Sequence, residues 1–236
     1  MSSDTAISFE NVSKIFSKGH SHHGTLREDL KSFFSRRNNT GQLKKNQFYA
    51  IKDLSFNVAK GESIGLYGPN GSGKSTLLKL IAKVLVPTRG NIKVNGRIAP
   101  LIELGAGFHP DLNGIENIYM NGAILGMSLG EIKSKIDQIV EYSGLSDFIS
   151  TPVKKFSSGM NLRLGFSIAL HSDADIFLID EILSVGDEEF KEKSFNSIME
   201  LLKKEKTLLI VSHNKEKLSQ TTDRIIYLEN GIIQNT

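Results

Sequence analysis

Short, mainly apolar runs are the dominant hydrophobic pattern of this chain. They occupy residues 64–67, 176–179, 208–212 and 224–228. Runs of this length are typical of strands that a parallel sheet buries on both faces. The segments between them carry apolar residues at helical spacing, as at residues 77–82. The pattern therefore predicts the α/β fold class, with a parallel core sheet and helices between its strands.

A second pattern, alternation, marks the N-terminal quarter of the chain. Residues 7–16 and 48–58 have the composition of strands, and Leu54, Phe56 and Val58 alternate with polar residues. Alternation is typical of a strand with one buried face. We therefore expect an antiparallel β part here.

Residues 110–156 have a helical pattern instead. Ser128 and Glu131 match a capping box, and apolar residues follow on one helix face, namely Ile132, Ile136, Ile139 and Val140. We expect the 236 residues to form a single domain with a substantial core. Its predicted parts are an antiparallel β part (7–62) with a basic insertion (17–47), a core (63–100 and 160–236) and a helical lobe (101–159).

The stretch from Gly68 to Thr76 carries the first candidate chemistry. It fits the pattern G-x-x-x-x-G-K-[ST] and lies between a predicted strand and a predicted helix. Glycines in such a turn let backbone N–H groups point at phosphate oxygens, and the helix N-terminus adds a favourable field. Lys74 supplies a charge for the β- and γ-phosphates, and Ser75 a hydroxyl ligand for Mg²⁺. The predicted phosphate-binding residues are Gly68, Asn70, Gly71, Ser72, Gly73, Lys74, Ser75 and Thr76.

Two adjacent carboxylates, Asp180 and Glu181, follow the apolar run at residues 176–179. An acidic pair at such a place can also be a helix cap. Together with the phosphate-binding loop it indicates a Walker B pattern, in which Asp180 holds Mg²⁺ through water and Glu181 accepts a proton from the attacking water. The sequence thus predicts an enzyme that hydrolyses a nucleoside triphosphate.

A third motif, Phe-Ser-Ser-Gly-Met at residues 156–160, precedes a helical run. Here the sequence resembles the ATP-binding cassette (ABC) family, whose Leu-Ser-Gly-Gly-Gln signature stands at this position. The resemblance implies an ABC ATPase with a P-loop fold and a RecA-like core, using ATP and Mg²⁺. It also implies that the signature binds the γ-phosphate of ATP held by the opposite subunit, here through Ser157, Ser158, Gly159 and Met160. A small hydroxyl and a glycine at a helix N-terminus suit an anion, whereas Ser158 and Met160 depart from the commonest residues of the family.

The resemblance also assigns roles beyond these motifs. His213, after the run at residues 208–212, stands at the switch position and would contact the γ-phosphate. The predicted catalytic residues are therefore Lys74, Glu181 and His213. Asp187 matches the D-loop aspartate and would communicate across the dimer.

Further residues are candidates for binding the metal ion and for stacking on the adenine ring of the nucleotide. Glu103 stands where the family usually has a metal-sensing glutamine, so Ser75, Asp180 and Glu103 are the predicted Mg²⁺ ligands. Phe16 stands where the family stacks an aromatic ring on adenine. Tyr49 is a competing ring, and the sequence leaves the two open.

Residues 101–110, Leu-Ile-Glu-Leu-Gly-Ala-Gly-Phe-His-Pro, resemble one branch of the family in particular. Its members are ATPase subunits of exporters that move lipid-linked polysaccharides, such as O-antigen, capsule or teichoic-acid precursors. This implies a homodimer on two copies of a polytopic membrane permease, a lipid-linked glycan as cargo and no nucleic acid. It also implies a peripheral place on the cytoplasmic face of the bacterial inner (cell) membrane. The candidate contacts with the permease are Phe108, His109, Ile115 and Tyr119.

Two alternatives stay open at this point. Another ABC transporter, for a drug, lipid or nutrient, would keep every catalytic residue, and only the segment at residues 104–110 argues against it. A soluble ABC protein of translation or DNA repair usually carries two cassettes or a long coiled-coil insertion. Neither feature is visible in this sequence.

Composition adds to this picture. No run approaches eighteen uninterrupted apolar residues and no secretory signal is visible, so we expect a peripheral subunit inside the cell. With no cysteine, the chain has no disulfides or thiolate metal sites.

Charge is distributed unevenly along the chain. The net charge is +3, yet residues 14–45 carry eight Lys or Arg against two acidic residues, so the rest of the chain sums to −3. Within this stretch a capping box at residues 25–28 and apolar positions 26, 30, 33 and 34 predict a short amphipathic helix. That helix either packs on the domain or lies near anionic lipid headgroups or the pyrophosphate of a lipid-linked glycan.

Overall fold

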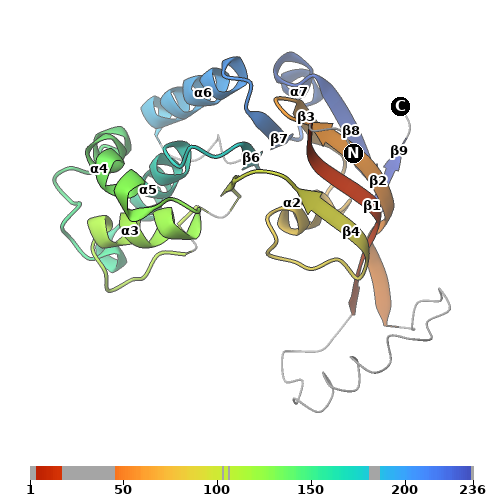
Figure 1. Ribbon diagram of the computed structural model, residues 1–236, viewed down its shortest axis with the longest axis horizontal. Coiled ribbons are helices and arrows are strands. Elements are labelled where there is room, and N and C mark those ends of the chain that lie inside the picture. The colour runs from red at the N-terminus through yellow and green to blue at the C-terminus, as the bar shows by residue number, and fades with distance from the viewer. Residues whose placement is uncertain (1–3, 18–45, 103, 106, 181–186, 235–236) are drawn as a thin grey trace, which may run out of the picture.

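Two β-sheets organise the protein, which we describe from a computed structural model (Figure 1). The structure describes residues 4–17, 46–102, 104–105, 107–180 and 187–234. The smaller sheet is antiparallel and has the strand order β2-β1-β4. Its strands are β1 (Thr5–Ser17), β2 (Gln47–Ala59) and β4 (Arg89–Val94). It confirms the predicted antiparallel part, whereas the expected amphipathic helix lies outside the described residues.

The larger sheet has the order β5-β6-β7-β3-β8-β9. Five strands run parallel to their neighbours: β5 (Ile98–Leu101), β6 (Ile176–Ile179), β7 (Thr207–Val211), β3 (Ser63–Tyr67) and β8 (Arg224–Glu229). A turn at Asn230 and Gly231 leads into β9 (Ile232–Gln234), which pairs antiparallel with β8. Every residue of β6 and β7 is buried, which explains their uninterrupted apolar sequences. The predicted parallel core is confirmed.

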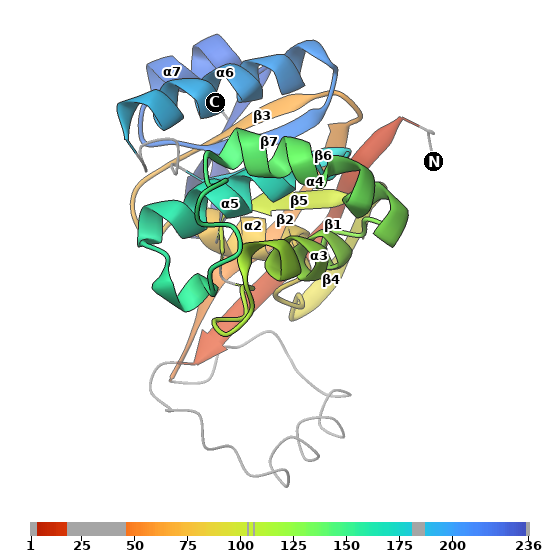
Figure 2. The same ribbon diagram turned by 90° about the vertical axis from the view of Figure 1, so that its left-hand side faces the viewer.

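Helices fill the segments between the strands. The described helices are α2 (Lys74–Ile81), α3 (Gly114–Ile124), α4 (Leu129–Ser143), α5 (Ser158–Leu170), α6 (Glu188–Lys203) and α7 (Lys215–Thr221), with a short 3₁₀ turn at Val153–Lys155. Figure 1 places α3, α4 and α5 on the side of the molecule away from β8 and β9, and Figure 2 views it from that side. Within the described residues, none of the helices combines the length and the apolar character that a membrane span requires.

Capping boxes start two helices of the lobe, α3 and α4. Ser128 and Glu131 form the predicted one at α4, and the hydrogen bond that the Ser128 N–H donates to Glu131 lowers the pKa of that carboxyl to about 2. Asn113 and Glu116 form a second box at α3, which the sequence interpretation did not include.

Helix α5 belongs to the lobe and to the core at once. Its Leu164 is buried with the apolar residues of α3 and α4, whereas Phe166 and Ala169 are buried with residues of the larger sheet. The predicted boundary at residue 160 therefore falls inside this helix, and the division of the chain into parts stays a prediction.

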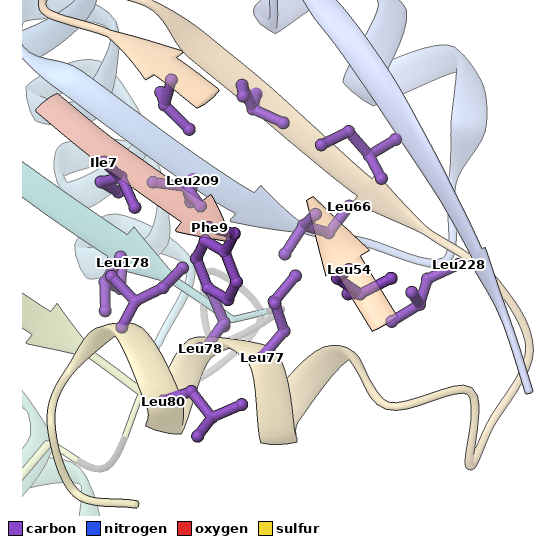
Figure 3. Packing of buried hydrophobic residues seen from close by; sticks show 14 of the residues in the cluster. Ile7, Phe9, Leu54, Leu66, Leu77, Leu78, Leu80, Leu178, Leu209 and Leu228 are labelled. Atoms are coloured by element: carbon purple, nitrogen blue, oxygen red, sulfur yellow. The ribbon is translucent and has the colours of Figure 1, made fainter. Parts of the chain in front are cut away.

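A single apolar cluster joins α2 to both sheets (Figure 3). Leu77 and Leu78 of α2 are fully buried in it, together with Phe9 of β1 and Leu66 of β3. Burying a leucine side chain contributes roughly 1.5–3 kcal/mol. Because several such contacts hold α2 from both sides, the N-terminus of this helix has a fixed place.

The strand that leads into α2 is fixed at its other end. Asp223 accepts hydrogen bonds from the backbone N–H of Ser63 at 2.8 Å and from the Ser63 hydroxyl at 2.7 Å. The backbone bond, more than any other contact, lowers the pKa of Asp223, so the group is a charged acceptor at neutral pH. The start of β3 is thereby tied to the start of β8.

Candidate functional site

The turn at residues 68–73 joins β3 to α2, and backbone contacts leave no room for a side chain at its first and last residues. Gly68 has a φ of 153°, and a Cβ atom there would lie 2.0 Å from the carbonyl oxygen of Leu228. Gly73 has a φ of 108°, and a Cβ atom there would lie 2.5 Å from the carbonyl oxygen of Ala50. Both positions therefore require glycine.

Hydrogen-bond donors gather around this turn. Lys74 is 7% exposed, and its Nζ donates to the carbonyl oxygens of Gly68 at 2.7 Å and Pro69 at 2.9 Å. Within the described residues no side chain caps α2, because its N-cap is Gly73. The buried hydroxyl oxygen of Ser72 has no hydrogen-bond partner in the described part of the chain. Backbone N–H groups, an ammonium and a hydroxyl together suit a phosphate group.

A pocket of about 830 Å³ opens over the turn. Its floor lies at the carboxyl ends of β6, β7 and β3, which are neighbours in the parallel sheet, and this places Asp180 and His213 beside the turn. The pocket is lined by Phe16, Phe48, Tyr49, Ala50, Asn70, Gly71, Ser72, Gly73, Lys74, Ser75, Thr76, Asp180, Val211, His213 and Asn230. The structure thus brings together the predicted loop, the first carboxylate of the acid pair and the predicted histidine.

Aromatic side chains form one wall of the pocket. Phe16 and Tyr49 both line it, so the choice between them for stacking on a base remains open. Phe48, which the sequence interpretation missed, pairs with Phe16 across β1 and β2, and the two ring centroids lie 6.1 Å apart. Phe48 is 40% exposed, and Lys14 Nζ lies 5.2 Å from the centroid of Phe16. Such a wall suits a planar heterocycle.

The predicted signature residues lie elsewhere, at the N-terminus of α5. Ser157 is the N-cap and its hydroxyl accepts from the Met160 N–H at 3.2 Å. Ser157 and Ser158 are exposed, and a Cβ atom at Gly159 would meet only the Ser157 hydroxyl, at 3.8 Å. These residues do not line the pocket of their own chain, as far as the described residues define it.

Other predicted site residues lie beyond the pocket or outside the described ranges. Asp187 is the N-cap of α6, where its Oδ1 accepts from the Phe190 N–H at 2.9 Å. Glu103 and Glu181 lie outside the described residues. Within the described ranges there is no cluster of three or more His, Asp or Glu side chains for a metal.

Mg²⁺ nevertheless fits the donors that are present. Magnesium is usually held by one or two protein oxygens together with substrate phosphates and water, rather than by a full protein cage. Ser75 and Asp180 line the same pocket and offer a hydroxyl and a carboxylate oxygen. A nucleotide phosphate bound in the turn would complete such a coordination sphere.

The fold and the pocket together define a P-loop nucleotide-binding protein. The phosphate-binding turn follows β3, an interior strand of the parallel sheet, and a carboxylate follows β6, two strands away. The chain belongs to the ABC transporter family, whose sequence pattern matches residues 51–184. The predicted family and its ATPase class are therefore confirmed.

Relatives from two bacteria are similar over most of the chain. The O-antigen export system ATP-binding protein RfbB of Klebsiella pneumoniae is 43% identical over 96% of this chain and 91% of its own length. The teichoic acids export ATP-binding protein TagH of Shouchella clausii is 41% identical over 86% of this chain, which spans 59% of that relative. The ATP-binding cassette MJ0796, in a dimeric state bound to ADP and Pi, has a TM-score of 0.73 at 22% identity and 97% coverage of both chains. That last likeness shows the fold.

The close contact at Gly73 predicts that even a methyl group will impair phosphate binding. Gly73→Ala should weaken ATP binding at least about tenfold, because alanine in a left-handed conformation costs roughly 1–2 kcal/mol and its Cβ would press on the Ala50 carbonyl. Gly130→Ala in α4 is the matched control, since its Cβ would meet nothing nearer than 4.0 Å. Titration with a fluorescent ATP analogue measures both affinities, and equal affinities would contradict the role of the turn.

Proposed function

We propose that the protein is the ATP-hydrolysing subunit of an exporter that moves a lipid-linked polysaccharide, of the O-antigen, capsule or teichoic-acid type, across the bacterial cytoplasmic membrane. The observation that carries this proposal is the 43% identity with an O-antigen export ATP-binding protein over 96% of the chain. The phosphate-binding pocket supports it, because such a subunit must bind and hydrolyse ATP.

Hydrolysis needs a clamp for the phosphates and a base for the water. Lys74 reaches the turn from the first position of α2 and would neutralise the β- and γ-phosphates. Mg²⁺, held by Ser75 and Asp180, would supply further charge neutralisation. Glu181 follows Asp180 directly and would accept the proton of the attacking water, while His213 would orient that water. Glu103 is a further proposed metal ligand.

One chain supplies only part of this site. The pocket holds the loop, Asp180 and His213, whereas the N-terminus of α5 is exposed on the surface of the same chain. A second copy, docked head to tail, would bring its Ser157 and Gly159 to the γ-phosphate. We therefore propose a homodimer that ATP closes and hydrolysis reopens, with this motion driving export.

The membrane subunit is proposed to dock on an apolar groove beside the lobe. The groove is lined by residues at and after the end of α2, by β5 and the segment after it, and by α3 and α5. Val84 is 63% exposed and Ile124 is 68% exposed, and both line it. Large exposed apolar side chains that gather in one place mark interaction surfaces.

None of the four contacts predicted from the sequence is among the residues that line this groove. Phe108, Ile115 and Tyr119 are partly buried against the core of the lobe, whereas His109 is exposed. Ile124 and Gly107 line the groove itself. We therefore place the centre of the proposed contact at Ile124, which is the last residue of α3, whereas the predicted Ile115 and Tyr119 lie earlier in the same helix.

Glu181→Gln should separate ATP binding from hydrolysis. Loss of the base should lower kcat by about 10²–10⁴-fold while ATP still binds and drives dimerisation. Glu188→Gln is the matched control, because Glu188 is an exposed carboxylate at the start of α6 that pairs with Lys191. A coupled phosphate-release assay and light scattering measure both properties. Wild-type turnover in Glu181→Gln would remove Glu181 as the base.

The same variant tests the cargo. Glu181→Gln protein, tagged and trapped with ATP in native membranes, should co-purify with a polytopic membrane protein and a lipid-linked glycan, identified by mass spectrometry. A permease with a drug, lipid or nutrient would favour another ABC transporter. Ribosomes, DNA or the absence of any membrane protein would contradict transport altogether.

Ile124→Glu should weaken attachment to the membrane subunit. A buried charge in an apolar contact is unfavourable, so the fraction of the protein that sediments with membranes should fall several-fold. Leu129→Glu is the matched control, because Leu129 is 70% exposed, at the start of α4, and does not line the groove. Both variants should hydrolyse ATP in isolation as the wild type does. Equal sedimentation of the two variants would place the contact elsewhere.

A further inference from the structure

A second pocket lies at the end of the parallel sheet opposite to the phosphate-binding turn. It has a volume of about 540 Å³ and is lined by the first residues of β6 and β7, Ile176 and Thr207. A strand rises about 3.3 Å per residue, so the length of β6 separates this pocket from the carboxyl end of the strand by roughly 10 Å. The second pocket shares no described lining residue with the nucleotide pocket.

Two turns form walls of the second pocket and hold each other in place. The Gly61 N–H, in the turn between β2 and β3, donates to the Thr207 hydroxyl oxygen at 2.9 Å. A Cβ atom at Gly61 would lie 3.1 Å from the carbonyl oxygen of Glu205, so the turn after α6 is in close contact with the first turn. The N–H groups of Glu205 and Lys206 donate back to the end of α6, both at 3.1 Å. The backbone that carries the lining side chains is therefore fixed.

Three lysine side chains bring positive charge to the second pocket. Lys60 comes from the turn between β2 and β3, whereas Lys204 and Lys206 lie in the turn after α6. Within the part of the chain that the structure describes, no ion pair or hydrogen bond engages these three ammonium groups. Ammonium groups form charge-assisted hydrogen bonds with phosphate oxygens. Together they suit a phosphate group.

Oxygen atoms that can accept hydrogen bonds line the same pocket. The Oδ2 of Asp175 accepts from the Arg97 N–H at 2.8 Å, and its Oδ1 has no partner among the described residues. The Asn95 side chain donates to a backbone carbonyl of β1 at 2.9 Å, and its Oδ1 is likewise without a described partner. Thr207 is 2% exposed, and its hydroxyl accepts the bond from the first turn but donates to no described acceptor. Carboxylate, amide and hydroxyl groups can each bind the hydroxyls of a sugar.

This combination of groups narrows the class of ligand. A bare inorganic anion would be repelled by the carboxylates of Asp175 and Glu205. A neutral sugar would leave the lysines unused, and a nucleotide base would lack an aromatic wall, because none of the described lining residues is aromatic. The volume lies within the range of about 300–1,000 Å³ that is usual for small-molecule pockets.

We propose that the second pocket binds a monosaccharide phosphate. The phosphate group lies between the ammonium groups of Lys60, Lys204 and Lys206. The sugar hydroxyls donate to the Oδ1 atoms of Asp175 and Asn95. The proposal is independent of the transport function, because it rests on a pocket at the other end of the sheet from the nucleotide pocket.

Isothermal titration calorimetry on the whole chain tests the proposal, with ADP and Mg²⁺ present to fill the nucleotide pocket. Glucose 1-phosphate is the probe and should bind at millimolar concentration or below. Inorganic phosphate and glucose should each bind at least about tenfold more weakly, because each lacks half of the contacts. The proposal fails if glucose 1-phosphate does not bind, if inorganic phosphate binds equally well, or if ADP abolishes the binding of glucose 1-phosphate.

Lysine variants test where the phosphate group binds. Lys204→Gln combined with Lys206→Gln should weaken the binding of glucose 1-phosphate at least about tenfold, because two charge-assisted hydrogen bonds are lost. Lys203→Gln is the matched control, since Lys203 is an exposed lysine at the end of α6 that does not line the pocket. All variants should keep the wild-type Tm. An equal loss of affinity in Lys203→Gln would indicate attraction to a basic surface and overturn the site.

Asp175→Asn separates recognition of the sugar from attraction of any anion. The asparagine can still accept from the Arg97 N–H, but the negative charge and one acceptor oxygen are lost. Inorganic phosphate should therefore bind several-fold more tightly, because repulsion is removed, whereas glucose 1-phosphate should bind several-fold more weakly. Tighter binding of both ligands would show that charge alone governs the pocket and would contradict the sugar contact.

Discussion

The turn at residues 68–73 depends on contact between backbone and backbone, with no side chain between them. Gly73 meets the Ala50 carbonyl of the antiparallel sheet, and Gly68 meets the Leu228 carbonyl of the parallel sheet. The turn therefore lies where the two sheets adjoin, and α2, buried against both, continues from it. This arrangement fixes the N-terminus of α2 at the edge of the parallel sheet where Asp180 and His213 also lie. Asp180 and His213 therefore have fixed places relative to the phosphate-binding turn.

The proposed site consists of two separate exposed surfaces of the chain. The pocket presents phosphate-binding donors and an aromatic wall, while the N-terminus of α5 presents its exposed Ser157 on a different part of the surface. In the proposed dimer, each of these surfaces would meet the other surface of the second chain, which is the geometry of a symmetric dimer with two shared sites. Within the chain, an ion pair between Arg163 of α5 and Asp187 joins α5 to the start of α6.

Local patterns account for what could be predicted from the sequence. The phosphate-binding turn, Asp180 and His213 follow apolar runs directly, and a parallel sheet brings the ends of such runs together. β5 was missed because it contains Pro100, which breaks the expected strand composition and is tolerated at the edge of the sheet. Phe48 and the Arg163–Asp187 pair were missed because both depend on contacts between segments distant in sequence, which periodicity does not show.

In the proposed dimer, each hydrolytic site is built from two copies of the chain. Mixing two inactive variants tests it directly: Lys74→Ala, which lacks the phosphate clamp, and Gly159→Asp, which places a carboxylate where the γ-phosphate of the partner would bind. Each variant alone should hydrolyse almost no ATP. Their mixture should regain activity, because a mixed dimer contains one site with an intact loop and an intact α5 N-terminus. Wild-type activity of Gly159→Asp alone, or no recovery in a mixture that forms dimers, would contradict a site shared between two chains.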